Sequence, residues 1–166
     1  MYGSASARSD GLLLLCGGRD VAGTPLDDAF GLARHRDGRW EWAAAPGTMP
    51  AARYQHASVF VGARLHVLGG AVGGGRMVDE PSAVVALDTS AGQWVGQAAA
   101  VAGAGGEAEG GDESMRRCRH AVAAVGPYVF VHGGLRGSTL LDDLLLADDS
   151  PGAGELAVCD PRAPAW

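Results

Sequence analysis

The chain has 166 residues, the size of one modest domain, and its apolar content of 47% is enough to build a core. Thirteen basic residues against nineteen acidic residues give a net charge of −6. This balance argues against broad electrostatic binding to nucleic acid or to an anionic membrane. The 27 glycines favour short strands joined by many turns over a helical protein.

The cysteines and the apolar runs restrict the compartment. Cys16, Cys118 and Cys159 are scattered and form no CxxC motif, so they predict free thiols in a reducing environment and neither a disulfide framework nor a zinc site. No apolar run approaches the length of about 18 residues that a membrane helix needs, and the N-terminus lacks the pattern of a signal peptide. We therefore expect a cytoplasmic or nuclear protein with no membrane or nucleic-acid partner.

The chain begins with a polar segment, residues 1–10, which we expect to form a loose N-terminus. Behind it, the apolar run at residues 11–16 predicts a strand that ends at Gly17 and Gly18. Glycine after a strand permits backbone conformations that are barred to other residues, and it leaves no Cβ to collide with a neighbouring element. These two glycines therefore mark the point where the chain leaves a crowded sheet.

Further strands belong to the same first unit, residues 11–52. A short apolar run at residues 29–32 is followed by Asp37 and Gly38, which are a strong signal for a hairpin turn. The next strand places Trp40 and Trp42 on one face, because successive side chains of a strand point in opposite directions. The unit therefore predicts an incomplete sheet with tryptophan on its outer strand.

The second unit comprises residues 53–97, and the segment that opens it is repeated later in the chain. Residues 53–70 read RYQHASVFVGARLHVLGG, and residues 117–134 read RCRHAVAAVGPYVFVHGG. Each copy opens with Arg-x-x-His, and a Gly-Gly pair begins thirteen positions after that histidine. Between them, a glycine turn separates two short apolar runs rich in β-branched and aromatic residues, which predicts a β-hairpin.

The repeat extends over several further positions. The repeated residues are Arg53, His56, Gly69 and Gly70 in the second unit, and Arg117, His120, Gly133 and Gly134 in the third. Trp94 follows Gly70 by 24 positions, as Trp42 follows Gly18. The Gly-Gly pairs are 52 and 64 positions apart, the length expected for the blades of a kelch-type propeller, each a four-stranded sheet. We therefore predict an all-β fold, a partial kelch β-propeller of about three four-stranded blades.

An acidic stretch rich in glycine and alanine, residues 98–115, interrupts the rhythm between the second and third units. Its glycines argue against a helix, so we predict a flexible loop between blades. The third unit, residues 116–166, starts with the second copy of the Arg-x-x-His segment and ends with an apolar run that could supply a last strand. Whether this unit is complete stays open.

The repeated polar residues are expected to be structural. Arg53 and Arg117 can hydrogen-bond loop carbonyls or an acid from a neighbouring blade, and contact with a ligand is the alternative. Trp42 and Trp94 are large apolar plates that suit the wide space between the outer strands of adjacent blades.

The sequence contains no recognisable catalytic or metal site. Of the five histidines only His56 and His120 occupy matching positions, and no HxH, HExxH or GxSxG motif occurs. The glycine-rich loop at residues 69–76 lacks the GK[ST] ending of a phosphate-binding loop. We therefore predict no catalytic residue, no cofactor-binding residue and no metal ligand.

Longer strings resemble a narrower family, the plant and algal kelch-repeat Ser/Thr protein phosphatases, whose land-plant members act in brassinosteroid signalling. The similarity covers residues 11–149, and the strings that carry it are GLLLLCGGRD, HRDGRWEWAAAPG, ARYQHASVFVGARLHVLGGAVGGGRMV, ALDTSAGQWV and RRCRHAVAAVGPYVFVHGGLRGSTLLDDLLLADDS. The resemblance implies a kelch propeller that precedes a metallophosphatase domain with two metal ions. That catalytic part needs GDxHG, GDxVDRG and GNHE segments, and none occurs in this chain. No catalytic residue or metal is therefore carried over.

The resemblance implies a non-catalytic module that recognises proteins. The predicted loops 71–81 and 135–140 follow Gly-Gly pairs on one face and are expected to contact partners, and Arg76 and Arg136 are candidate contacts for acidic or phosphorylated partner segments. A closed kelch ring normally needs about six blades. We therefore expect a fragment that needs the rest of a propeller, or a chain that self-associates to cover its open sheets.

Two alternatives stay open. One is an enzyme on the analogy of copper-containing kelch-propeller oxidases. Such an enzyme needs a cluster of Tyr, Cys and His ligands, and the tyrosines that this chain could offer are Tyr2, Tyr54 and Tyr128. The other is a truncated remnant with no retained function.

Overall fold

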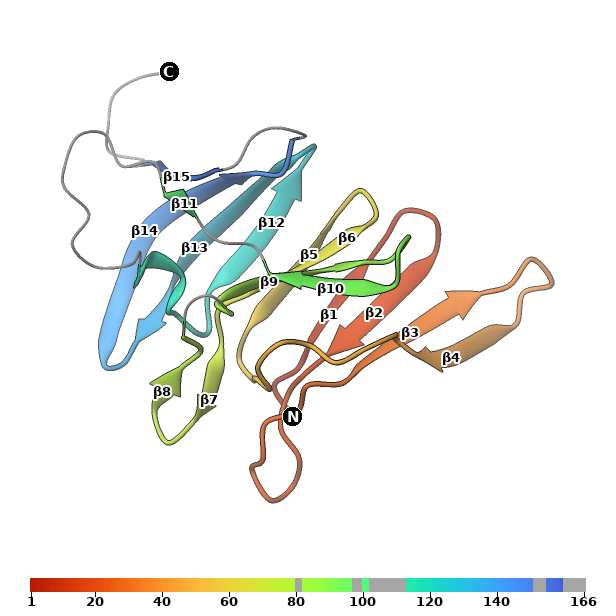
Figure 1. Ribbon diagram of the computed structural model, residues 1–166, viewed down its shortest axis with the longest axis horizontal. Coiled ribbons are helices and arrows are strands. Elements are labelled where there is room, and N and C mark those ends of the chain that lie inside the picture. Colours follow the sequence, from red (N-terminus) through yellow and green to blue (C-terminus); the bar gives the residue numbers. More distant parts are fainter. Residues whose placement is uncertain (80–81, 97–99, 102–112, 151–154, 160–166) are drawn as a thin grey trace.

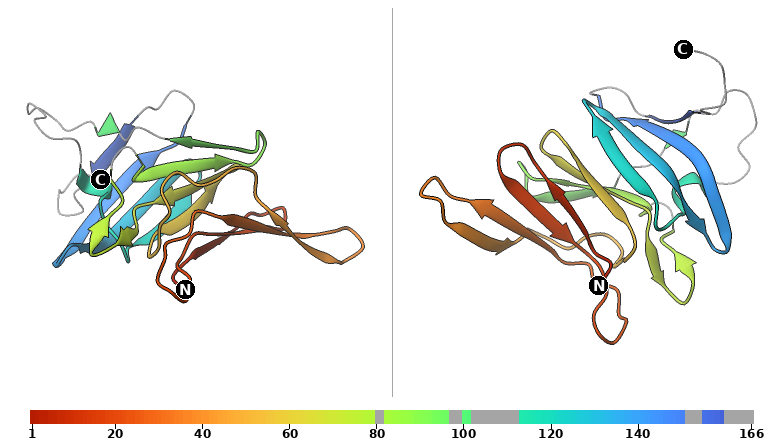
Figure 2. Two further views of the ribbon diagram at one scale, coloured as in Figure 1. Left: turned by 60° about the horizontal axis from the view of Figure 1, so that its bottom comes forward. Right: turned by 180° about the vertical axis from the view of Figure 1, so that it is seen from behind.

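The computed structural model describes residues 1–79, 82–96, 100–101, 113–150 and 155–159, and strands dominate them. Three sheets stand side by side and fan outward like the blades of a propeller (Figure 1). Figure 2 shows the fan from two further directions, with each sheet facing its neighbour. No helix within the described residues is long and apolar enough to cross a membrane.

The first blade contains four antiparallel strands. They are β1 (Ser4–Ala7), β2 (Leu12–Cys16), β3 (Ala29–Arg34) and β4 (Trp40–Ala44). The prediction that residues 1–10 form a loose N-terminus is wrong for β1, which pairs with β2 along its length. The alternation of serine and alanine in β1 is a weak signal, but β2 presents a row of backbone groups that β1 satisfies. The first blade is therefore a full four-stranded sheet, not an incomplete one.

The second blade also contains four antiparallel strands. They are β5 (Ala57–Val61), β6 (Arg64–Leu68), β9 (Val84–Asp88) and β10 (Gln93–Gly96). The hairpin predicted around Gly62 is confirmed, with Val61 directly opposite Arg64. A small separate hairpin of β7 (Ala71–Gly73) and β8 (Arg76–Met77) rises from the connection between β6 and β9.

The third blade has five strands where the sequence predicted four. They are β12 (Ala121–Val125), β13 (Tyr128–Arg136), β14 (Thr139–Asp148), β15 (Glu155–Cys159) and β11 (Ala100–Val101), which pairs parallel to β15. The stretch 98–115 is thus not loop throughout, since it contains β11 and a 3₁₀ turn, η1 (Glu113–Met115). The rest of that predicted loop, and residues 160–166 of the third unit, lie outside the described residues.

The third Gly-Gly pair lies within a strand. Gly133 and Gly134 belong to β13, where the register with β14 shifts between His132 and Gly134. Segment 135–140, predicted to be a loop, is instead the tip of the long β13–β14 hairpin, with Arg136 opposite Thr139. The bulge lets the strand continue past the glycines, because the extra residue re-aims the chain without ending the pairing.

Two hydrophobic clusters fill the spaces between the blades. The cluster between the first and second blades contains Leu14, Cys16, Ala29, Met49, Leu65, Val67, Val85 and Leu87. The cluster between the second and third blades contains Leu68, Ala83, Val84, Met115, Val129, Val131 and Leu145. The second blade is therefore covered on both faces, and the first and third blades each pack one face against it.

Equivalent backbone contacts relate one blade to the next. The inner strands meet, β1 with β5 and β5 with β12, on the side of the fan that we call the hub. The amide of Gly18 donates to the carbonyl of Arg53 at 2.8 Å, and the amide of Gly70 donates to the carbonyl of Arg117 at 2.7 Å. The all-β, partial-propeller fold is confirmed.

Candidate functional site

The first repeated arginine is a buried charge held by backbone carbonyls. Arg53 is 0% exposed. Its Nη1 donates to the carbonyl of Gly69 at 3.0 Å, its Nη2 to that of Ser82 at 2.6 Å and its Nε to that of Ala51 at 3.1 Å. Burial lowers the pKa of this guanidinium to about 10, so it stays charged at neutral pH. One side chain thus joins the segment that enters the blade to the turns that leave it.

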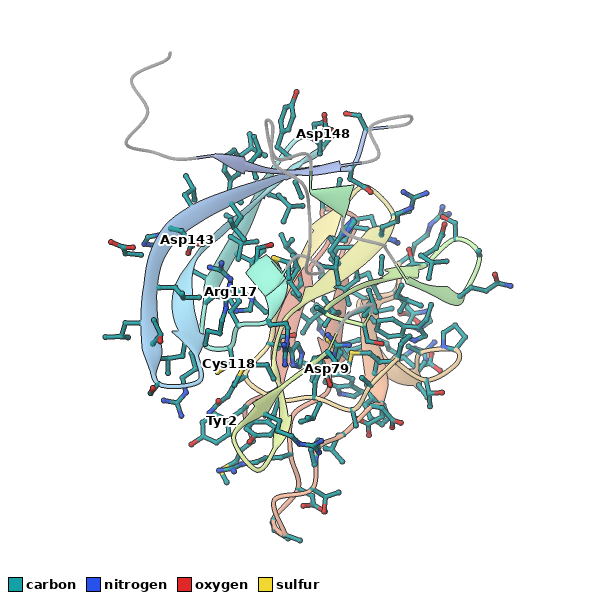
Figure 3. All side chains as sticks on the ribbon, turned by 60° about the vertical axis from the view of Figure 1, so that its left-hand side comes forward. Tyr2, Asp79, Arg117, Cys118, Asp143 and Asp148 are labelled. Atoms are coloured by element: carbon teal, nitrogen blue, oxygen red, sulfur yellow. The ribbon has the colours of Figure 1, made fainter. Side chains whose placement is uncertain are left out.

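The second repeated arginine uses a carboxylate as well. Arg117 is fully buried; its Nη1 donates to the carbonyl of Gly133 at 2.9 Å, and its two terminal nitrogens donate to the two carboxylate oxygens of Asp143 at 2.7 Å each (Figure 3). These charge-assisted hydrogen bonds lower the pKa of Asp143. The expected backbone carbonyls accept from both arginines, but the acid comes from the same blade and not from a neighbouring one, because Asp143 lies on β14.

The repeated histidines are buried. His56 Nε2 lies 3.5 Å from the Cys16 sulfur, across the space between the first and second blades. Burial, reinforced by the nearby Arg53 charge, lowers the pKa of His56 to about 3. Burial and Arg117 lower the pKa of His120 to about 4. Both rings are therefore neutral at physiological pH.

The Gly-Gly pairs create the space for these histidines. A Cβ at Gly17 (φ +56°) would lie 2.7 Å from His56 Cε1, and a Cβ at Gly69 (φ +58°) would lie 2.8 Å from His120 Cε1. Real Cβ atoms essentially never approach so closely, so only glycine allows this packing. Glycine of one blade and histidine of the next therefore form a joint between blades. Gly18, Gly70 and Gly134, the second glycines, are packed against the segments that lead into the inner strands.

The two outer-strand tryptophans differ in environment. Trp94 is half-buried against the cluster between the first two blades, as the sequence predicted for a plate between blades. Trp42 occupies the same place in the first blade but is 54% exposed. It lies on the face that points away from the second blade, so the expectation that it fills a space between blades is not met within this chain.

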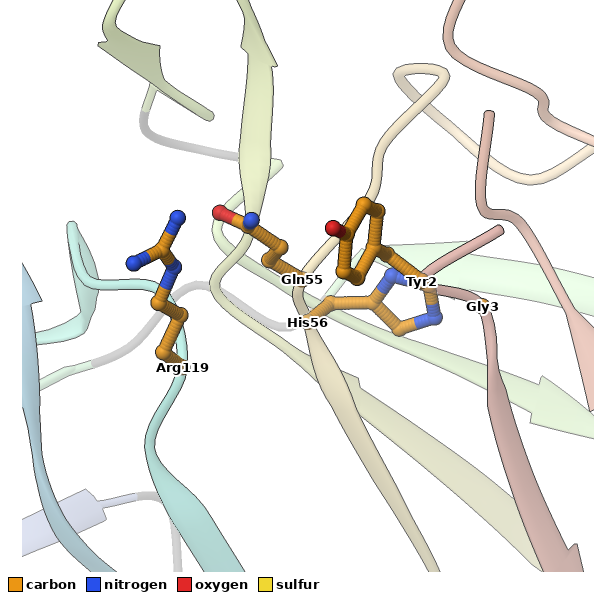
Figure 4. Close-up of a pocket in the computed structure, with 5 residues that line it drawn as sticks. All are labelled: Tyr2, Gly3, Gln55, His56 and Arg119. Atoms are coloured by element: carbon orange, nitrogen blue, oxygen red, sulfur yellow. The ribbon is translucent and has the colours of Figure 1, made fainter. Parts of the chain in front are cut away.

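A cavity opens at the hub where all three blades begin. Tyr2, Gln55 and Arg119 have positive φ angles of 63°, 57° and 58°, and a chain of hydrogen bonds links them: the Arg119 amide donates to Gln55, and the Gln55 amide donates to Tyr2. With Gly3 and His56 they line a cavity of about 480 Å³, which we call the hub cavity (Figure 4). Each blade thus contributes its first residues to one shared site.

A second pocket with an aromatic and basic lining lies next to the hub cavity and shares residues with it. The Arg19 guanidinium lies 4.9 Å from the ring centroid of Tyr2 and 5.3 Å from that of Tyr54, within the range of cation–π attraction. Arg119 and Gln55 line both pockets, and the second pocket extends to the β7–β8 hairpin and the tip of the β13–β14 hairpin. Among the described residues that line the two pockets, none is acidic.

Comparison with known proteins shows a close similarity to a protein phosphatase. The chain is 62% identical over 157 residues to serine/threonine-protein phosphatase BSL2 of Arabidopsis thaliana. The resemblance to this phosphatase family is confirmed. The match covers 90% of this chain but 15% of that protein, so the chain spans about one seventh of the length of its phosphatase relative. No family model matches the chain.

The two metal ions that the phosphatase family implies have no place among the described residues. No group of three His, Cys, Asp or Glu side chains in that part of the chain could hold a metal ion. The tyrosines proposed for a copper site are not gathered either: Tyr2 and Tyr54 flank Arg19, and Tyr128 lies on β13. The residues described therefore fit neither the metal pair nor the oxidase cluster.

Arg76 and Arg136, the candidate contacts from the sequence, line neither pocket, but each lies in the chain between two residues of the second pocket. Arg76 is exposed on β8, beside the pocket residues Gly75 and Met77. Arg136 is half-buried, and its Nη2 lies 3.5 Å from the carbonyl of Ser114. Arg76 is thus the more accessible of the two guanidinium groups.

Sequence reasoning missed three residues of the hub cavity. Tyr2 was placed in a loose terminus, and Gln55 and Arg119 were only the variable residues inside Arg-x-x-His. The available signal was their position: a residue that varies beside an invariant histidine is free to contact something other than the fold. The convergence of three such positions required the arrangement of the blades.

Proposed function

We propose that this chain is a non-catalytic protein-interaction module that corresponds to a regulatory or substrate-recognising part of a Ser/Thr protein phosphatase. The similarity to BSL2 supports the phosphatase context. The fold supports the module, because a propeller presents connecting loops and hairpins from a rigid set of sheets. Arg76, Arg119 and the hub cavity are the elements that we assign to partner recognition.

The observation that carries this proposal is the state of Arg119 in the hub cavity. Its side chain is exposed and forms no hydrogen bond or ion pair with another described residue, whereas Arg53 and Arg117 donate hydrogen bonds from all three guanidinium nitrogens. Its backbone has φ +58°, an uncommon conformation for a residue with a side chain. A cationic fork held at the convergence of three blades, in a chain of net charge −6, suits a ligand of opposite charge.

The chemistry of the lining favours an acidic or phosphorylated segment of a protein partner. Arg119 can donate two parallel hydrogen bonds to a carboxylate or phosphate, and the Gln55 amide can donate a third. Tyr2 and Tyr54, which hold Arg19 between them, offer apolar surface to the flanking residues of the partner. Arg76 on β8 adds a second cation at the rim.

Fluorescence anisotropy with a labelled phosphoserine peptide and its unphosphorylated counterpart tests the proposal. Arg119→Glu should weaken binding of the phosphopeptide about tenfold or more, because a charge-assisted hydrogen bond contributes about 1.5–3 kcal/mol. Arg76→Glu should have a smaller effect, because a rim charge mainly changes the association rate.

Arg36→Glu is the matched control, since Arg36 is exposed at the β3–β4 turn and lines neither of the two pockets. An equal loss of binding in Arg36→Glu and Arg119→Glu would indicate non-specific charge effects. Failure of the wild-type chain to bind any acidic or phosphorylated probe would remove the proposed ligand class.

A further inference from the structure

The first blade has an apolar face that points away from the second blade. Strand pairing places side chains of all four strands on it: Ala5, Ala7, Leu13, Leu15, Phe30, Leu32, Arg34, Trp40, Trp42 and Ala44. Leu15 is 37% exposed, Phe30 43% and Trp42 54%. A continuous apolar surface that includes two tryptophans is unusual on an isolated soluble domain and marks an interaction site.

The third blade has its own outward face at the other end of the fan. Pairing of β12, β13 and β14 places on it Ala121, Ala123, Val125, Tyr128, Phe130, His132, Leu144, Leu146 and the acidic Asp148. Val125 is 67% exposed and Tyr128 is 42% exposed. This face, too, is mostly apolar.

The second blade shows what covers the surface that corresponds to the outward face of the first blade. Counting from the Gly-Gly pairs and the strand pairing, the outward residues Leu13, Leu15, Phe30, Leu32 and Trp42 correspond to Leu65, Val67, Val85, Leu87 and Trp94. In the second blade these residues are packed against the first blade, and the four aliphatic ones are at most 1% exposed. The outward face of the first blade therefore has the composition of a surface that belongs against another blade.

The second blade also shows what covers the surface that corresponds to the outward face of the third blade. The third-blade residues Val125, Tyr128 and Phe130 correspond to Val61, Arg64 and His66 of the second blade. That surface of the second blade packs against the third blade, where Val61 joins the cluster between them and Arg64 pairs with Asp149 at 3.3 Å. The chain thus carries at its two ends the two complementary halves of the contact that it twice makes internally.

We propose that two copies of this chain associate head to tail, with the outward face of the first blade of one copy packed on the outward face of the third blade of the other. The charged side chains described on the two faces, Arg34 on the first blade and Asp148 on the third, have opposite signs, so they allow this contact. Arg34 occupies the place of Asp149, and Tyr128 occupies the place of its partner Arg64. The ion pair between the second and third blades would be replaced by an arginine beside a tyrosine ring, an attractive pair rather than a repulsive one.

The contact between copies lacks one element of the internal joints. His56 and His120 pack on the first glycine of the preceding blade, but the corresponding position of the first blade is Gly3. The association therefore depends on the two apolar faces and the Arg34–Tyr128 pair, without a histidine–glycine joint, and we expect it to be reversible. The contact is heterologous, because it joins two different surfaces. It therefore forms a closed ring if the rotation from copy to copy returns to the first copy, and longer open arrays if it does not.

Light scattering coupled to size-exclusion chromatography over a concentration series tests this proposal. The wild-type chain should rise with concentration from 16.8 kDa to at least twice that mass. Trp42→Glu should lose the larger species because it places a charge on the first-blade face, and Val125→Glu should lose it because it does so on the third-blade face. Val21→Glu is the matched control, since Val21 is fully exposed in the β2–β3 loop and is not among the strand residues that form either face, so the change should leave the mass of the association unaltered.

A mixture of the two variants distinguishes head-to-tail association from any other pairing. Each variant keeps one intact face, so the mixture should recover a species of two chains that neither variant forms alone. A wild-type chain that stays at 16.8 kDa at every concentration would overturn the proposal. So would association that survives in Trp42→Glu or in Val125→Glu. If either variant loses its β-type circular dichroism, the milder pair Trp42→Ser and Val125→Ser is measured and interpreted in the same way.

Discussion

The joint between blades predicts that two glycines with nearly the same backbone conformation differ sharply in their tolerance of alanine. Gly69 has φ +58° and Gly62 has φ +55°, and both lie at the ends of β6. A Cβ at Gly69 would collide with the carbonyl oxygen of Arg117 and lie 2.8 Å from His120 Cε1. A Cβ at Gly62 would have nothing within 4 Å.

The magnitudes follow from these distances. Alanine in the left-handed region costs roughly 1–2 kcal/mol of folding free energy, and this term is common to both sites. At Gly69 the alanine also forces the second and third blades apart, which adds roughly 2 kcal/mol, within the range for overpacked cores. We therefore expect Gly69→Ala to lower the free energy of unfolding by about 3–4 kcal/mol and Gly62→Ala by about 1–2 kcal/mol.

Urea unfolding followed by circular dichroism measures both variants, with the midpoint and the slope fitted together so that a change in stability is separated from a change in the surface exposed. The difference between the two variants isolates the contact between blades, because the backbone term cancels. Equal losses at Gly69 and Gly62 would refute the reasoning, since they would show that the next blade does not press on Gly69.

Two further predictions concern the buried side chains. The pKa values of His56 (about 3) and His120 (about 4) lie below the ordinary value of 6.5, so the unfolded chain takes up protons first. The free energy of unfolding should be highest above about pH 6.5 and fall by about 2 kcal/mol per histidine by about pH 5. Urea midpoints measured across this range should depend less on pH in His120→Gln than in the wild type. A wild-type midpoint that is constant down to about pH 5 would contradict the burial of both rings. Trp94→Ala should lower the free energy of unfolding by about 2–3 kcal/mol, because the ring packs between blades. Trp42→Ala, measured at low protein concentration, should lower it by less than about 1 kcal/mol, because that ring is exposed. Similar losses in the two variants would contradict the difference in packing.

Much of the fold is legible in the sequence because its signals are local. A strand followed by glycines, a turn at Gly62 and a second strand form a hairpin from contacts between residues that are close in the chain. The repeat then multiplies this signal, since the segments 53–70 and 117–134 must fold alike. The N-terminal strand β1 escaped prediction because serine and alanine carry little preference, and only pairing with β2 makes that segment a strand.

The site was less predictable, because it depends on which elements become neighbours. The sequence indicated that Arg117 needs acceptors, but not that Asp143 of the same blade supplies two of them. It also assigned one role to Trp42 and Trp94, although only Trp94 has a blade to pack against.

The amino-acid sequence by itself thus determined the repeated hairpins, their glycine turns and the spacing of the blades, because each follows from side-chain pattern and backbone freedom within a short segment. The convergence of Tyr2, Gln55 and Arg119 on one cavity was decided only by the tertiary structure. Residues so far apart in the chain meet because burial of apolar surface between the sheets sets how one blade stacks on the next.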